Sequence, residues 1–250
     1  MLSVSSPSAG GRPSSSITSD SLARFAELVN KIGTSPAAAL RKRRNTARKK
    51  LKRIIDEQRK FAKPASLRAV ALTLTYRDAT LFSSKHISAF LDRLRRALKR
   101  TGHSLPYTWV LDRASHLHYH LILWLPRGYN LDPARLAKWW TWGSTWVESC
   151  RSVKAWGRYM AKFDSIPTLP KGARLYGYGG LDDAGTLAVS RATLPRWLQA
   201  LLPAGHRARR CPGGGWVDMA TGEIYRSPYT WTPRGAILAA VRRPTCHGVA

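Results

Sequence analysis

Three of the seven histidines stand at alternate positions within five residues, in the run His116-Leu117-His118-Tyr119-His120. Alternation of this kind predicts a β-strand, in which side chains two residues apart share one face and lie about 7 Å apart. The three imidazoles would then form one row. Two neighbouring imidazoles in such a row can turn toward one metal ion, so the spacing predicts a metal site.

A carboxylate can complete the donor set of this site. The stretch 106–112 has the composition of a second strand, and a short connection joins it to the histidine strand as a hairpin. Asp112 ends this strand and could supply an oxygen ligand, with His116 as the alternative third ligand. Such a set leaves positions open on a divalent ion, Mg²⁺ or Mn²⁺, which a phosphate oxygen could fill.

Tyr159 and Lys162 add a possible nucleophile and a cation. They lie in the stretch 152–163, which has helical periodicity, and their separation of three residues puts them on nearly the same face. A phenol is a poor nucleophile until its phenolate is stabilised, which the Lys162 ammonium could do. With the metal site they suit transesterification, in which Tyr159 attacks a DNA phosphodiester. The alternative is that Tyr159 belongs to the core and Lys162 is merely solvated.

The net charge of +28 predicts a polyanionic partner, and nucleic acid is the usual one. The densest basic run would form a helical arm that contacts DNA phosphates, or else a solvated helix that only keeps the protein soluble. The predicted DNA-binding residues of this arm are Arg41, Lys42, Arg43, Arg44, Arg48, Lys49, Lys50, Lys52 and Arg53.

A membrane is the other polyanionic surface to consider. No apolar run of the sequence approaches the roughly 18 residues of a spanning helix, so we expect no membrane partner. The three cysteines stand far apart and form no Cys-x-x-Cys pair. Their scatter favours a reducing cytosol and argues against a cysteine zinc site.

The order of the remaining signals predicts the fold. A strand over 69–76 and a helix from Ser84 precede the predicted hairpin, and helices opened by Asp132-Pro133 and Ser152 follow it. Strand, helix, strand, strand, helix is the order of an α+β fold, with an antiparallel sheet and helices packed on one face. Nearer the C-terminus, a short helix at 194–198 and a hairpin across Thr221-Gly222 are expected.

Three runs in this order resemble the motifs of HUH endonucleases, and more narrowly those of rolling-circle replication initiators of single-stranded DNA phages and plasmids. The runs are Leu72-Thr73-Leu74-Thr75-Tyr76, His118-Tyr119-His120 and Tyr159-Met160-Ala161-Lys162-Phe163. The resemblance covers about residues 67–180 and implies a HUH, ferredoxin-like core. It implies His118 and His120 as ligands and Tyr159 as nucleophile, with Asp112 where many relatives have an acidic ligand. Where some phage initiators have a second active tyrosine, this chain has Phe163.

The resemblance implies an enzyme that nicks single-stranded or origin DNA in the cytoplasm of a bacterial host, leaving a 5′-phosphotyrosine and a free 3′-OH. Because the sequence has no Gly-x-x-x-x-Gly-Lys-Ser/Thr motif, a host helicase and polymerase would be needed. The alternatives are a HUH transposase or relaxase and a non-catalytic basic DNA-binding module. Residues 1–63 are expected to be a disordered tail and basic helical arm, 64–180 the HUH endonuclease domain, and 181–250 an extension of unknown role.

Overall fold

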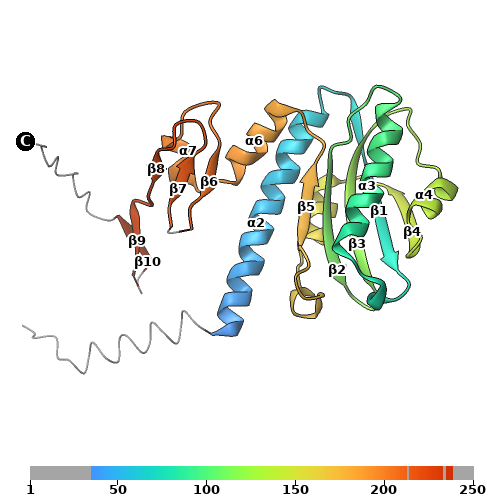
Figure 1. Ribbon diagram of the computed structural model, residues 1–250, viewed down its shortest axis with the longest axis horizontal. Coiled ribbons are helices and arrows are strands. Elements are labelled where there is room, and N and C mark those ends of the chain that lie inside the picture. The colour runs from blue at the N-terminus through green and yellow to red at the C-terminus, as the bar shows by residue number, and fades with distance from the viewer. Residues whose placement is uncertain (1–34, 213, 233–234, 239–250) are drawn as a thin grey trace, which may run out of the picture. The chain divides into compact units, whose positions relative to one another are not determined.

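The computed structural model describes residues 35–212, 214–232 and 235–238 (Figure 1). The disordered tail expected at the N-terminus lies outside these residues. The chain divides into two compact units, residues 1–41 and 42–250, and the first enters the described part only as the opening residues of a helix. Among the described helices, none has the length and apolarity to cross a membrane.

A five-stranded antiparallel sheet forms the centre of the second unit, in the strand order β4-β1-β3-β2-β5. This confirms the predicted α+β fold. The strands are β1 (Leu67–Tyr76), β2 (Tyr107–Arg113), β3 (Leu117–Pro126), β4 (Gly143–Ser149) and β5 (Tyr176–Gly179). The first three are the predicted strands, and β2 and β3 form the predicted hairpin.

One face of the sheet packs against α3 (Ser84–Lys99) and α4 (Pro133–Trp139). The odd-numbered residues of β3 point to this side, where Tyr119 and Leu121 pack with Phe90 of α3 in the main core. Both helices start where polar side chains cap them. Ser83 accepts a hydrogen bond from the Lys85 N–H, and Asp132 accepts one from the Ala134 N–H, with Pro133 at the first helical position.

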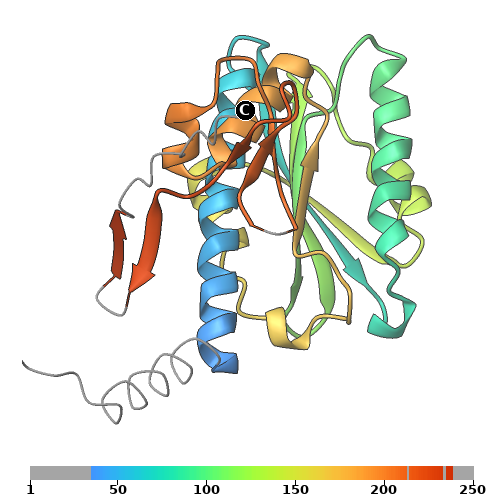
Figure 2. The same cartoon turned by 60° about the vertical axis from the view of Figure 1, so that its left-hand side comes forward.

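The opposite face is covered by α2 (Pro36–Ala62) and α5 (Val153–Met160), so the expectation of helices on one face only is wrong. Figure 2 shows α2 and α3 on opposite sides of the sheet. The basic sequence of α2 contains an apolar stripe, in which Leu51, Ile54 and Ile55 are buried. Gly157 of α5 lies against Ile55, and a Cβ atom there would come within 3.1 Å of the Ile55 Cδ1.

Gln58 ties α2 to the sheet. Its side chain is fully buried, and its Nε2 donates a hydrogen bond to the Tyr107 carbonyl at 2.8 Å. Its Oε1 accepts hydrogen bonds from the Thr108 hydroxyl at 2.7 Å and from the Trp124 indole N–H at 3.2 Å. One amide therefore satisfies polar groups of both β2 and β3.

The edge strands β4 and β5 lie where the sequence predicts no strand. In β5, two glycines replace the β-formers of an ordinary strand because aromatic side chains of β2 lie across them. A Cβ atom on Gly177 would come within 2.5 Å of the Trp109 ring, and one on Gly179 within 2.8 Å of the Tyr107 hydroxyl. In β4, Gly143 lies so close to Thr75 that a Cβ atom would overlap its carbonyl oxygen.

The chain beyond the sheet forms smaller elements. The predicted short helix starts two residues later than expected, as α7, and the hairpin across Thr221-Gly222 is confirmed by the pairing of β7 with β8. The remaining elements are α6 (Asp183–Thr193), α7 (Arg196–Leu201), β6 (Ala208–Arg210), β7 (Trp216–Asp218), β8 (Ile224–Tyr225), β9 (Tyr229–Thr232), β10 (Gly235–Leu238) and the 3-10 helices Ala79–Leu81 and Ile166–Thr168.

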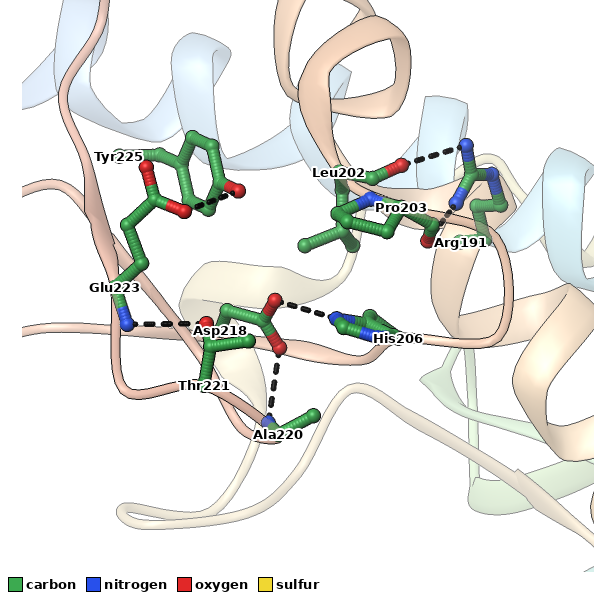
Figure 3. Close-up of polar contacts among 9 residues, drawn as sticks. All are labelled: Arg191, Leu202, Pro203, His206, Asp218, Ala220, Thr221, Glu223 and Tyr225. Carbon is green, nitrogen blue, oxygen red and sulfur yellow. Dashed lines mark hydrogen bonds and ion pairs between the residues drawn. The ribbon is translucent and has the colours of Figure 1, made fainter.

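A buried carboxylate holds the β7–β8 turn together (Figure 3). Asp218 is 1% exposed, and it accepts hydrogen bonds from His206 Nδ1 at 2.6 Å and from the Ala220 N–H at 2.9 Å. The hydrogen bond from His206 lowers the pKa of the Asp218 carboxyl. Because these contacts fully occupy the pair, we assign it a structural role.

Replacing Gln58 by alanine is expected to lower the free energy of unfolding by about 2–3 kcal/mol, because it leaves buried polar groups of both strands without partners. Chemical denaturation measures the change. The matched control is Arg59→Ala, which removes an exposed side chain from the same helix turn and should change stability by less than about 0.5 kcal/mol. Equal stability of the two variants would contradict the anchoring role of Gln58.

Candidate active site

The register between β2 and β3 brings together the three predicted ligands. Asp112 pairs directly with His118, and His120 follows two residues later on the same face of β3. One donor atom from each of Asp112, His118 and His120 lies within 4.8 Å of the other two. The sheet geometry therefore forms a cluster that can bind a metal ion.

The His118 ring is oriented by the backbone of His116. Its Nδ1 lies 2.8 Å from the His116 carbonyl oxygen, which can only accept a hydrogen bond, so Nδ1 carries the proton. Its Nε2 is then left with a lone pair, and it faces His120 Nε2 at 2.9 Å. Two nitrogens this close suit neighbouring ligands of one ion, since nitrogen ligands lie about 2.1 Å from a metal and about 3 Å apart.

His116 itself does not join the row of imidazoles. β3 begins at Leu117, and His116 lies exposed in the bend before it. The predicted row therefore has two members, and the third position of the cluster belongs to Asp112. The contribution of His116 to the geometry is its carbonyl group, which no sequence pattern distinguishes.

The His120 ring is buried and neutral. It is 5% exposed, and its Nδ1 lies 3.2 Å from the Thr73 hydroxyl of β1. Burial, with the neighbouring His118 as a smaller cause, lowers the pKa of His120 to about 4. At neutral pH the ring therefore keeps a lone pair for a ligand bond. Thr73 was visible in the sequence only as part of a motif, and its register opposite His120 gives it this role.

The Asp112 carboxylate is also held in place. Its Oδ1 accepts hydrogen bonds from the Arg113 N–H at 2.9 Å and from the Ser165 hydroxyl. Ser165 is buried in the segment that follows α5, and no sequence pattern selects it. Two imidazole nitrogens and a carboxylate oxygen form a donor set that suits a divalent ion with open positions.

Tyr159 lies beside this cluster. Its side chain is 44% exposed, so the alternative that it belongs to the core is wrong. Its ring centroid lies 5.1 Å from that of His120, and the Trp156 ring stacks on it at 5.3 Å. The Nζ atom of Lys162 lies 4.6 Å from the centroid of the phenol ring. The predicted nucleophile, cation and ligands thus meet at one place.

The helix that carries Tyr159 is shorter than predicted, and α2 holds its end. α5 ends at Met160, and Phe163 has a left-handed φ of 52°. The Arg48 guanidinium donates hydrogen bonds to the Ala161 carbonyl at 2.9 Å and to the Lys162 carbonyl at 2.8 Å. Arg48 thereby satisfies carbonyl groups that a continuing helix would have bonded internally.

Three arginines of the predicted DNA-binding set contact the protein itself. Besides Arg48, Arg44 forms an ion pair with Asp164 at 3.1 Å, and Arg53 donates to the carbonyls of Ala192 and Leu194, each at 3.1 Å. The other members lie on exposed parts of α2, apart from the half-buried Lys50, and their role in DNA binding stays a prediction. They are Arg41, Lys42, Arg43, Lys49, Lys50 and Lys52.

Comparison with known families supports the resemblance. Residues 69–164 match the family model described as replication-associated protein ORF2/gene 2 protein. This stretch, less than half of the chain, includes the three cluster residues, Tyr159 and Lys162. No curated protein and no solved structure gives a significant match.

The cluster predicts a metal-dependent gain in stability. Mn²⁺ at 100 times its dissociation constant should stabilise the wild-type protein by about 2.7 kcal/mol, measured as a rise in the thermal unfolding midpoint. Asp112→Ala, His118→Ala and His120→Ala should each lose most of this rise. His116→Ala is the matched control and should keep it. A rise lost in His116→Ala and kept in Asp112→Ala would instead make His116 the third ligand.

Proposed function

Because residues 69–164 match the family of replication-associated ORF2/gene 2 proteins, we propose that this protein initiates rolling-circle replication by nicking origin DNA through Tyr159. The observation that carries the proposal is the position of the exposed Tyr159 phenol, 5.1 Å from the His120 ring in the Asp112-His118-His120 cluster. A phosphodiester bound at the cluster would lie within reach of this phenol. The match to a replication family favours an initiator over a transposase or relaxase.

The proposed reaction exchanges one phosphodiester for another. The Tyr159 oxygen attacks the phosphorus atom, the bond from phosphorus to the 3′ oxygen breaks, and the proton lost by the phenol is balanced by the proton gained by the 3′ oxygen. The products are a 5′-phosphotyrosine and a free 3′-OH, and the bond energy is kept for rejoining. Lys162 stabilises the negative charge that develops near the phenol oxygen.

Asp112, His118 and His120 would hold Mg²⁺ or Mn²⁺. The chemistry that such an ion supplies when bound is Lewis-acid polarisation of a phosphodiester oxygen. Thr73 and Ser165 keep His120 and Asp112 in their ligand orientations through the hydrogen bonds described above.

One tyrosine has to serve the whole cycle at this site. Phe163, which stands where some phage initiators have a second tyrosine, is 2% exposed, and its ring packs near Tyr176 at 6.2 Å. Closing the displaced strand then requires the reverse reaction at Tyr159, another nucleophile, or a second protomer. A host helicase and polymerase would supply unwinding and extension, which places the reaction in the cytoplasm of a bacterial host.

DNA outside the cleavage site would meet two basic surfaces. One is the exposed side of α2. The other is a pocket of about 390 Å³ between α3 and α4, on the opposite side of the sheet from the cluster. Trp139 lines this pocket, and its ring centroid lies 5.9 Å from the Arg135 guanidinium carbon. The other arginines that line it are Arg93, Arg96 and Arg100. Such a pocket suits backbone phosphates and carries no sequence preference.

Tyr159→Phe is expected to lower formation of the covalent DNA adduct at least about 10³-fold, because the attacking oxygen is removed. Single-stranded oligonucleotides that tile the replicon encoding the protein are incubated with Mn²⁺, and adducts are counted after denaturing electrophoresis. Tyr178→Phe is the matched control, since Tyr178 is 39% exposed on β5, and it should keep the wild-type yield. A wild-type protein that binds these DNAs but forms no adduct would favour the non-catalytic DNA-binding module.

Arg48 and its neighbour Lys49 are expected to affect different steps. Arg48→Ala removes the hydrogen bonds that position the end of α5, so the nicking rate at saturating DNA should fall about 10- to 100-fold with little change in affinity. Lys49→Ala should lower affinity and reduce the slope of log affinity against log salt by about 0.7, with the saturated rate unchanged. Arg48→Ala with an unchanged rate and a reduced salt slope would return Arg48 to the DNA-binding set.

A further inference from the structure

Trp146 is the most exposed of the large apolar side chains in the part of the chain that the structure describes, at 68%. It lies on the edge strand β4, which pairs only with β1. Full exposure of an indole costs hydration free energy that burial elsewhere would have recovered, so an exposed tryptophan on a flat sheet edge calls for a functional explanation.

The sheet register places Trp146 on the same face as the candidate metal cluster. Trp146 pairs with Thr73, and Thr73 pairs with His120, so the three residues form one row across β4, β1 and β3. Directly paired residues share a face, and the Thr73 hydroxyl does reach the His120 ring. With strands about 4.8 Å apart, Trp146 lies roughly 10 Å from His120 along this row.

This part of the face is open. Along β4, Thr145 and Val147 are half-buried toward the main core side, whereas Ser144, Trp146 and Glu148 alternate with them and are exposed. α2 and α5 contact the sheet through β2, β3 and the segment after α5, as described above. The indole therefore borders the cluster without any described element covering it.

We propose that Trp146 stacks on an unpaired base of the DNA strand whose backbone crosses the metal cluster. The inference rests on the proposed function, because it takes the position of the strand from the site of nicking. Every base has a π-face, and stacking on an exposed aromatic ring is how single-stranded DNA is held without sequence readout. At 3.4 Å or more per nucleotide, a distance of roughly 10 Å puts this base about two to three nucleotides from the cleaved phosphodiester.

The charges along β4 favour this occupant and its direction. Glu148 stands beyond Trp146 on the same face, paired with Ala71, and it repels phosphate groups. Ser144 stands on the other side, paired with Thr75, which in turn pairs with His118. A strand that leaves the cluster thus meets neutral side chains up to Trp146 and a carboxylate after it. This limits the platform to one base.

The test compares two oligonucleotides with equal charge, a 20-nucleotide deoxythymidine strand and a 20-nucleotide abasic strand. The wild-type protein should bind the thymidine strand more tightly. Trp146→Ala should weaken binding of that strand about tenfold and leave binding of the abasic strand unchanged, with the same salt slope for both. Trp146→Phe keeps an aromatic face and should retain most of the preference. Leu201→Ala, which removes another exposed apolar side chain at 57% exposure, should behave as wild type.

Three results would overturn the proposal. They are equal weakening of both strands by Trp146→Ala, no weakening of either, and a change in oligomeric state by light scattering, which would make β4 an interface between copies of the chain. The readout is binding, so it does not depend on nicking. A Tyr159→Phe protein should show the same preference for bases, which keeps failure of this proposal distinct from failure of the proposed function.

Discussion

Asp112 faces His118 across the β2–β3 ladder because the other side of that ladder is buried. Leu117, Tyr119 and Leu121 enter the core beneath α3, and burial of each such side chain is worth about 1.5–3 kcal/mol. A slip of one residue would expose all of them and move the carboxylate to the wrong face. The apolar half of β3 thereby fixes the geometry of its polar half, and the candidate active site follows from the register.

The basic helix α2 connects the charge of the protein to this geometry. Its buried stripe and Gln58 attach it to the sheet, and Arg48 holds the end of the helix that carries Tyr159. The like charges along α2 are tolerated because carbonyl groups and Asp164 accept hydrogen bonds from several of them. The same segment can therefore present an exposed basic surface and position a functional residue.

The sequence was sufficient where side-chain periodicity carries the information. Alternation located β1, β2 and β3, and the types and spacing of His118, His120 and Tyr159 located the candidate site. It was insufficient where a partner distant in the chain decides the structure. The glycines of β5 look like a loop until the rings of Tyr107 and Trp109 are placed across them. The contacts of Arg48 with backbone carbonyls and of His118 with the His116 carbonyl have no signature in side-chain type.

Gln58 also bears on where the independently folding unit begins. The family match starts at residue 69, whereas the hydroxyl of Thr108 and the indole N–H of Trp124 have their partner on a helix that precedes it. A fragment cut at the boundary of the match would leave these groups desolvated and unbonded. During synthesis, α2 leaves the ribosome before either strand exists and can dock only once β3 has emerged. Truncated chains and evolutionary fusions that preserve the sheet must therefore carry the basic helix with it.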